Sequence, residues 1–442
     1  MRRNLVRAVA ICVFAGNAQA LYHEGYVDAN RWWMPLANNG TFAVSYSHGY
    51  DCTWRSRSHT YFYNGGPWIG VVKNGDTLVS VACNPNNPHA FDTSPGDSLG
   101  GEFDSLVLVY VYPRNWPPPA SRFPEAPQFR RADQDAWMSF NDLDSSQQYP
   151  PAPHRPIGIQ FTQSTYLWGD QLAQDFVYHR YTFENQSGDT LYNVYFGIAL
   201  DPDLGDATDD MCGVFYHRWF RLGEHESLYV DNLAYAFDAT NSEPGWDTVG
   251  VVGASLIKSP GRHTVSALKK WTLEVDPLYD PEQYLALAGY DWRSHAYAPI
   301  DSVDTVPGDK RMLIAMGPFN LLPQQEDSAV LVVLGVATWP DTAALVRALH
   351  VADSIYRNRP SGVASWPDER LRMVSGPTFI HGTLSLSDAI RAAVLLDASG
   401  RTVARLRPGA NDVRALAPGV YFVRTAQAQA QAQALRKVVL TK

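Results

Sequence analysis

The stretch that most constrains the fold is "DFVYHRYTFENQSGDTLYNVYFGIAL", in which apolar and polar residues alternate on both sides of a Ser187-Gly188-Asp189 bend. Alternation with a period of two places every second side chain on one face of a β-strand. We therefore expect this segment to form an antiparallel hairpin. The Asn74-Gly75 pair between "GGPWIGVVK" and "DTLVSVAC" predicts a second hairpin, because both residues accept positive φ.

The composition also favours short strands over long helices. The chain holds 13 Trp, 23 Tyr and 18 Phe together with 32 Gly and 30 Pro, and aromatic residues suit strands while Gly and Pro suit turns. "FDSLVLVYVYP" is another predicted strand. One amphipathic helix is expected near residues 341–356, because Asp341 precedes a helical stripe of Leu345, Leu349, Ala352 and Tyr356. We predict a mostly β fold whose body is one or two β-sandwich units carrying this helix.

Residues 1–20 have the features of a signal peptide. Three arginines precede a short apolar run, and Ala18-Gln19-Ala20 supplies a small-x-small cleavage site. No later segment reaches the roughly 20 apolar residues that a membrane-spanning helix needs. We therefore expect an exported protein without a transmembrane segment.

Charge divides the rest of the chain. Residues 371–442 hold ten Lys and Arg against three Asp, whereas the whole chain has a net charge of −9. The predicted segments are an acidic, aromatic-rich body at 21–358, a linker at 359–370 and a small basic domain at 371–442. An acidic body disfavours nucleic acid as a partner.

Gly96-Asp97-Ser98-Leu99 matches the motif for which the GDSL lipases and esterases are named. Related Gly-Asp-Thr-Leu steps at 75–78 and 188–191 occupy predicted bends, where Gly supplies positive φ and Asp bonds the local backbone. A nucleophile elbow needs a buried strand before it and a helix after it, whereas the segment before Ser98 is polar and broken by proline. We interpret the motif as a turn, and a serine esterase using Ser98 is the lesser alternative.

Five carboxylates lie within ten residues at the end of a predicted strand. Such a group must be solvated or must share a cation, and calcium takes several oxygens from a turning loop, which Gly205 would allow. The two readings are solvated turn residues or a calcium site. The candidate ligands are Asp201, Asp203, Asp206, Asp209 and Asp210.

Three cysteines remain after removal of residues 1–20. Export permits disulfides, and Cys52 with Cys83 is the pairing we predict. Cys212 is expected to be a buried free thiol.

No catalytic set stands out, so the expected function is non-catalytic binding, adhesion or structure, with a surface glycan or protein as ligand. The alternative is a carbohydrate-binding module or a glycoside hydrolase. Aromatic residues that could stack on sugars support it, and among the 45 Asp and Glu a catalytic pair cannot be chosen from sequence. The aromatic candidates are Trp54, Trp68, Trp116 and Trp168.

The last seventy residues contain "DASGR", "LAPGVYFVR" and a terminal "KVVLTK". This combination resembles the C-terminal sorting domain of type IX secretion cargo, a small Ig-like β-sandwich. A Pro-Asn-Pro motif usual at the start of that domain is missing, and an Ala-Gln repeat over Ala426 to Ala434 is expected to be an expanded hairpin loop. The matching residues are Gly400, Pro418, Gly419, Tyr421, Lys437 and Lys442.

The resemblance implies Sec export into the periplasm and passage through the outer-membrane type IX translocon. The protein would then be secreted or attached to the cell surface. The body resembles uncharacterised extracellular proteins that carry such tails, and that resemblance implies no activity.

Overall fold

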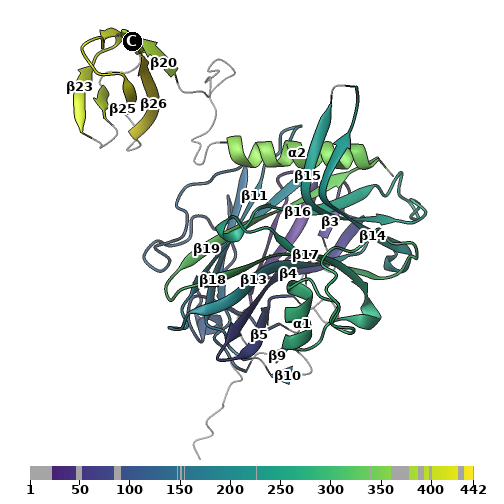
Figure 1. Cartoon of the computed structure of the whole chain (residues 1–442). Helices are drawn as coiled ribbons and strands as arrows, with labels where there is room; N and C mark the ends of the chain where they lie inside the picture. Colours follow the sequence, from purple (N-terminus) through teal and green to yellow (C-terminus); the bar gives the residue numbers. More distant parts are fainter. Residues whose placement is uncertain are drawn as a thin grey trace, which may run out of the picture. The chain divides into compact units, whose positions relative to one another are not determined.

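The computed structural model describes residues 22–45, 52–83, 91–146, 148–149, 152–153, 155–224, 226–338, 341–359, 378–386, 393–397, 401–426 and 433–441. The chain divides into two compact units, Met1–Ala364 and Ser365–Lys442. Both units consist mainly of β-strands (Figure 1), as the sequence predicts.

One large antiparallel sheet of the first unit, here sheet A, has eight strands in the order β1-β2-β3-β4-β13-β18-β17, with β5 paired to β4. Its strands are β1 (Glu24–Val27), β2 (Trp32–Ala37), β3 (Cys52–Trp54), β4 (Thr60–Lys73), β5 (Asp76–Val81), β13 (Leu191–Pro202), β17 (Val265–Thr272) and β18 (Lys310–Leu321).

The second large sheet, sheet B, has nine strands in the order β14-β15-β16-β19-β12-β11-β8-β6, with β7 paired to β8. Its strands are β6 (Ser94–Pro95), β7 (Tyr110–Val111), β8 (Gln134–Asn141), β11 (Ile159–Leu167), β12 (Phe176–Asn185), β14 (Asp210–Arg221), β15 (Ser227–Asp238), β16 (Val251–Lys258) and β19 (Glu326–Val336). Two short strands, β9 (Gln148–Tyr149) and β10 (Ala152–Pro153), pair with each other. Single 3₁₀ turns are η1 (Gly101–Phe103), η2 (Ala207–Asp209), η3 (Pro260–Arg262) and η4 (Leu273–Val275).

The main core lies between the two sheets. Alternate residues of β12, among them Tyr181 and Phe183, are fully buried there, as are Phe196 and Ile198 of β13. The rings of Phe183 and Phe196 stack with centroids 5.0 Å apart, which joins sheet B to sheet A. The body is therefore a single β-sandwich, with its apolar side chains interleaved between the sheets.

Two helices cover the outer faces. The predicted helix is present as α2 (Thr342–Asn358), and the Asp341 carboxylate accepts a hydrogen bond of 2.9 Å from the Ala344 amide as its N-cap. Leu345 and Leu349 pack on the outer face of sheet B. A shorter helix that the sequence analysis missed, α1 (Asp280–Leu287), packs on the outer face of sheet A.

The expected hairpin around Gly188 is wrong. β12 pairs with β11 and β19 in sheet B, whereas β13 pairs with β4 and β18 in sheet A, so the bend carries the chain from one sheet to the other. Buried Asn185 holds this corner, because its Nδ2 donates to the carbonyls of Asp189 (2.7 Å) and Leu321 (2.9 Å). The alternation correctly predicts two strands, but a period of two does not identify the partner of each strand.

The hairpin at Asn74-Gly75 is confirmed. β4 and β5 pair from Lys73↔Asp76 onward, and both turn residues have positive φ (54° and 88°). The strand predicted in "FDSLVLVYVYP" is shorter than expected. Only Tyr110–Val111 pairs, and η1 and turns precede it.

The second unit is a small β-sandwich. A five-stranded sheet, in the order β20-β26-β25-β22-β23, shares a core with the pair β21-β24. The Ala-Gln repeat is partly strand, because Thr425↔Ala434 and Ala426↔Gln433 continue the β25–β26 pairing. The strands are β20 (Thr378–His381), β21 (Thr383–Leu386), β22 (Ala393–Leu396), β23 (Thr402–Leu406), β24 (Gly409–Asp412), β25 (Gly419–Ala426) and β26 (Gln433–Thr441).

Candidate functional site

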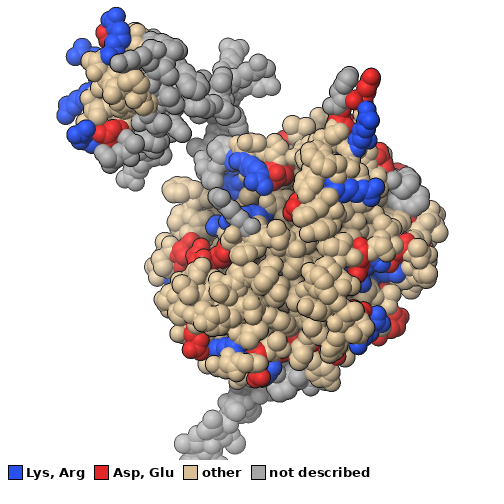
Figure 2. Space-filling model, in the orientation of Figure 1, with Lys and Arg blue, Asp and Glu red and all other residues tan. Residues whose placement is uncertain are grey.

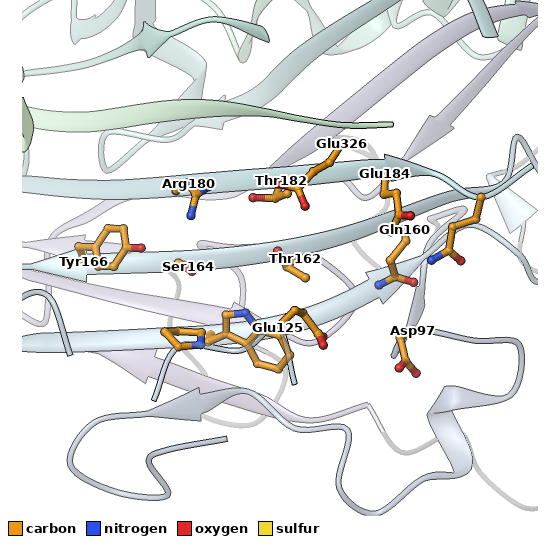
Figure 3. A pocket seen from close by; sticks show the side chains of 13 residues that line it. Asp97, Glu125, Gln160, Thr162, Ser164, Tyr166, Arg180, Thr182, Glu184 and Glu326 are labelled. Atoms are coloured by element: carbon orange, nitrogen blue, oxygen red, sulfur yellow. The ribbon is translucent and has the colours of Figure 1, made fainter. Parts of the chain in front are cut away.

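A polar cavity of about 490 Å³ opens on the outer face of sheet B. This sheet-B cavity has its floor on β8, β11, β12 and β19, and the segment 95–127 forms a facing wall (Figure 3). Its volume falls within the range of small-molecule sites, roughly 300–1,000 Å³. It is lined by Asp97, Glu125, Pro127, Trp137, Gln160, Thr162, Ser164, Tyr166, Arg180, Thr182, Glu184, Gln186 and Glu326.

The strand register explains why polar side chains collect here. Odd-numbered residues of β11 and β12 face the core, so the even-numbered ones point outward. Direct pairing places these outward residues in rows across the sheet. The rows are Gln160–Glu184–Glu326, Thr162–Thr182–Ser328 and Ser164–Arg180.

The next row along the sheet is apolar. Tyr166 and Tyr178 pair directly, and the Tyr178 hydroxyl donates to the Ala352 carbonyl of α2 at 3.0 Å. Helix α2 thus covers one part of this face and leaves the polar rows uncovered. Three rows of hydrophilic residues on an otherwise covered sheet face mark this cavity as the candidate site.

The facing wall is held by a buttressing arginine. Arg122 donates to both carboxylate oxygens of Asp97 (2.6 and 2.7 Å) and to Asp104 (2.7 Å). These bonds lower the pKa of Asp97, so its carboxylate is the charged form. Burial raises the pKa of nearby Glu125.

The charges that line the cavity are unbalanced. Four carboxylates, those of Asp97, Glu125, Glu184 and Glu326, stand against one guanidinium, that of Arg180. Arg180 makes no ion pair within 4 Å with any carboxylate in the described part of the chain. The Arg180 guanidinium on the cavity floor is therefore available to donate hydrogen bonds to a ligand.

Gln160 fixes the end of the cavity floor. Its Nε2, which carries two hydrogens, lies within hydrogen-bond distance of the Ser139 hydroxyl (2.8 Å) and of the carbonyls of Phe161 (2.9 Å) and Phe140 (3.0 Å). Its Oε1 is buried and makes no hydrogen bond within the described residues.

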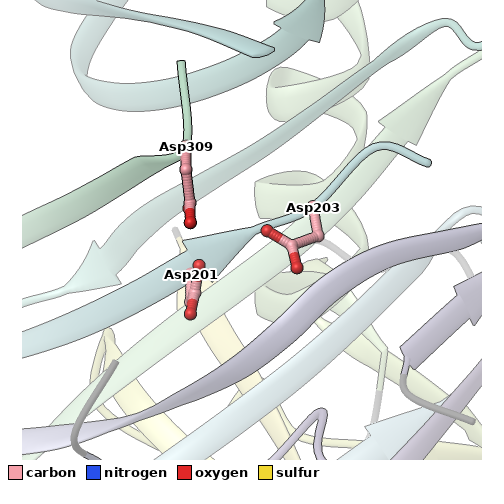
Figure 4. A group of neighbouring side chains, drawn as sticks. All are labelled: Asp201, Asp203 and Asp309. Atoms are coloured by element: carbon pink, nitrogen blue, oxygen red, sulfur yellow. The ribbon is translucent and has the colours of Figure 1, made fainter. Parts of the chain in front are cut away.

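The five predicted calcium ligands do not form one group. Asp201 and Asp203 lie with Asp309 (Figure 4), and their ligand atoms are within 4.8 Å of one another. The Arg311 guanidinium lies among these three carboxylates, 2.6 Å from the buried Asp201 carboxylate. A guanidinium already supplies the positive charge there, which disfavours a metal ion.

The remaining aspartates lie elsewhere. Asp209 joins a separate group with Asp238 and Glu243, and buried Asp210 is the direct cross-strand partner of Asp238. Asp206 is exposed, and its carboxylate accepts from the Thr208 amide and hydroxyl. Asp238 and Glu243 are distant in sequence from "DPDLGDATDD", so the spacing of acidic residues along the chain does not predict that they join Asp209.

The predicted Cys52–Cys83 disulfide is wrong, because both residues are buried free thiols. Cys52 pairs with Phe62, whereas Cys83 packs 2.7 Å from the Cβ position of Gly66, four residues further along β4. Four strand residues span about 13 Å, and a disulfide requires Cα atoms within about 7 Å. Cys212 is a buried free thiol, as predicted.

Ser98 lies exposed in a bend between β6 and η1. Its backbone carbonyl accepts from Asn141 (3.3 Å), and no histidine of the described residues makes a hydrogen bond to it. Its neighbour Asp97 lines the cavity wall. The motif therefore shapes a wall of the site through a turn.

None of the four tryptophans predicted as sugar platforms lines the cavity. Trp54, Trp68 and Trp168 are buried, and Trp116 is half-buried against a small cluster around Tyr110. The cavity has Trp137 and Tyr166 instead, both largely covered by neighbours.

In the second unit, Pro418 is exposed and Gly419 begins β25. Tyr421 is buried, and its hydroxyl donates to the Ala417 carbonyl at 2.9 Å. Lys437 lies on β26. Residues 1–20 with Ala18 and Ala20, Gly400, Lys442 and all but Arg359 of the proposed linker lie outside the described residues.

On the face drawn in Figure 2, acidic and basic side chains of the first unit are interspersed among uncharged ones. No helix in the described part of the chain is long and apolar enough to cross a membrane.

Comparisons with known proteins assign no family. No family model matches the chain, and no curated protein matches it. A solved structure named "Polysaccharide Lyase BACCELL_00875" aligns with a TM-score of 0.26 and 9% identity, over 85% of this chain and 39% of that chain. A "Putative kojibiose phosphorylase from human microbiome" aligns with a TM-score of 0.27 and 8% identity, over 78% and 37%. The chain thus spans about two fifths of each protein, and likeness at these scores carries no argument about activity.

Proposed function

We propose that this protein is an exported, non-catalytic binding protein whose sheet-B cavity holds a neutral glycan. The observation that carries the proposal is the composition of the cavity. Carboxylates, hydroxyls, amides and one guanidinium converge on a space of about 490 Å³. Sugars present many hydroxyls, each of which donates and accepts, and such a mixed lining can satisfy both roles.

The charge of the cavity favours a neutral ligand over an acidic one. Asp97 is paired with Arg122, but the three remaining carboxylates still outnumber Arg180, so a uronic acid or phosphate would meet net repulsion. A neutral saccharide can instead use the carboxylates as acceptors for its hydroxyl protons. Charge-assisted hydrogen bonds of this kind are about twice as strong as neutral ones.

A glycan array probed with the full-length protein tests the proposal. We expect selective binding to a small set of neutral oligosaccharides. An array on which no glycan binds above background, or on which only anionic glycans bind, would contradict it.

Two conservative substitutions should weaken that binding. Glu184→Gln or Glu326→Gln keeps the shape of the floor and removes a charged acceptor, so each should raise Kd about tenfold for a glycan selected on the array. Isothermal titration calorimetry measures the change. Glu274→Gln, at an exposed residue outside the cavity, is the matched control and should leave Kd unchanged.

Hydrolysis is the second candidate, and one observation favours it. Glu184 and Glu326 are direct cross-strand partners, so their side chains leave the same face of the cavity floor and their carboxyl groups can approach each other. Retaining glycosidases hold their two carboxyl groups about 5–5.5 Å apart. Release of reducing sugar by the wild type, abolished in both Gln variants, would establish this candidate in place of simple binding.

We further propose that the second unit directs export through the type IX route, on the resemblance of its "LAPGVYFVR" and "KVVLTK" segments. Deleting 416–442 should trap the protein in the periplasm of a host with that machinery, because β25 and β26 would be lost. Immunoblots of cell fractions measure this. Removing only 427–432 is the control and should leave release intact, whereas undiminished release of the 416–442 deletion would refute the proposal.

A further inference from the structure

We propose that Asp209, Asp238 and Glu243 form a calcium-binding site at the end of the β14–β15 pair. One oxygen from each residue lies within 4.8 Å of the others. Calcium binds oxygens at about 2.3–2.6 Å, so two ligands on opposite sides of one ion are separated by about this distance. The site is separate from the sheet-B cavity, and the inference does not depend on the proposed function.

Unsatisfied buried oxygens are the independent observation that points to a ligand. Asp238 is fully buried, and its Oδ1 accepts from the Thr240 amide (2.7 Å), the Thr240 hydroxyl (3.0 Å) and the Ser242 amide (3.2 Å). Its Oδ2 is buried without a hydrogen-bond partner, and so is Oδ1 of Asp209. A buried carboxylate oxygen without a donor is costly unless a proton or a cation neutralises the group.

A fourth carboxyl group, which is buried, lies beside these three. Asp210 lies directly opposite Asp238 across β14 and β15, is fully buried, and leaves its own Oδ1 without a partner. No Lys, Arg or His in the described ranges lies within 4 Å of any of these four carboxylates. This group differs in that respect from the Asp201 group, where Arg311 is present.

The surrounding backbone already orients the ligands. Glu243 Oε1 accepts from the Asp206 amide at 2.9 Å, which ties the 239–249 loop to the turn before β14. The Trp246 amide donates to the Glu243 carbonyl at 3.0 Å and closes a turn in that loop. A bound ion would therefore join the start of β14, the end of β15 and this loop.

Thermal melting of the full-length protein in CaCl₂, MgCl₂ or EGTA tests the inference. At a calcium concentration a hundredfold above Kd, the Tm should rise by about 4 °C over the EGTA value, with little change in MgCl₂. Asp238→Asn should abolish the rise. Asp231→Asn, at an exposed residue of the same strand, should keep it.

Equal Tm values of the wild type in CaCl₂ and EGTA would overturn the inference, and so would a full calcium response in Asp238→Asn. Equal shifts in MgCl₂ and CaCl₂ would overturn the assignment to calcium. If Asp238→Asn fails to fold, Glu243→Gln at a half-buried loop position takes its place with the same expected results. Terbium luminescence sensitised by Trp246 gives a second readout, which the wild type should show and Glu243→Gln should lose.

Discussion

Replacing Arg311 with methionine should lower the free energy of unfolding by about 3–5 kcal/mol, because the substitution leaves buried carboxylates without their cation. Arg311 is 4% exposed in its side chain and lies 2.6 Å from Asp201, which is 1% exposed. It also pairs with Asp309. Methionine fills a similar volume, so the decrease in the free energy of unfolding is due to the unpaired carboxylates and not to a cavity.

Urea denaturation of the full-length protein at neutral pH measures this change. The matched control is Arg293→Met, whose partner Asp291 is 3.5 Å away at the surface, and it should change stability by less than about 0.5 kcal/mol. Adding Asp201→Asn to Arg311→Met should recover much of the loss. A stability of Arg311→Met within about 1 kcal/mol of the wild type would contradict the role given to this ion pair.

The pH dependence of the same variant should have a definite sign. Burial raises the pKa of the Asp201 carboxyl and the Arg311 guanidinium opposes that rise, so removing the guanidinium leaves the pKa higher than in the wild type. A group whose folded pKa lies above its unfolded value loses stability as pH rises between the two values. The deficit of Arg311→Met should therefore shrink as the pH falls toward the unfolded-state pKa of aspartate.

Replacing Thr182 with tryptophan should reduce glycan affinity at least a hundredfold. Thr182 lies in the middle row of the cavity floor and points into open space, so an indole there fills the cavity without displacing core residues. The Tm should stay close to the wild-type value for the same reason.

Titration calorimetry with a glycan selected on the array measures the effect. Gln171→Trp, at an exposed position that does not line the cavity, introduces the same side chain and should leave Kd unchanged. Undiminished binding by a folded Thr182→Trp would place the ligand elsewhere on the protein.

Local patterns predicted the class of fold but not the strand partners. Alternation of apolar and polar residues correctly predicts the strands on both sides of Gly188. Asp341 and the apolar residues at helical spacing after it correctly predict α2. The pairing of β12 with β19 joins residues about 150 positions apart, and no local signal encodes such a contact. The same limit explains why the sequence predicts a hairpin at Gly188, where the chain instead passes from one sheet to the other.

The candidate site was less accessible to sequence reasoning than the fold. Its polar rows come from the outward residues of β11, β12 and β19, whose alignment depends on a register that only the folded sheet defines. One signal was present: Thr182 and Glu184 are hydrophilic residues at outward positions of a strand that is otherwise buried. The proposed calcium ligands show the same dependence, because Asp209 precedes β14, whereas Asp238 ends β15 and Glu243 lies in the loop after it.

A crystal structure of the full-length protein with an array-selected oligosaccharide tests the central claim most directly. The account predicts sugar density between the outward residues of β11 and β12 and the wall at Asp97 and Glu125, with a hydroxyl on Glu184 or Glu326. Sugar bound on another surface while this cavity contains only solvent would contradict it.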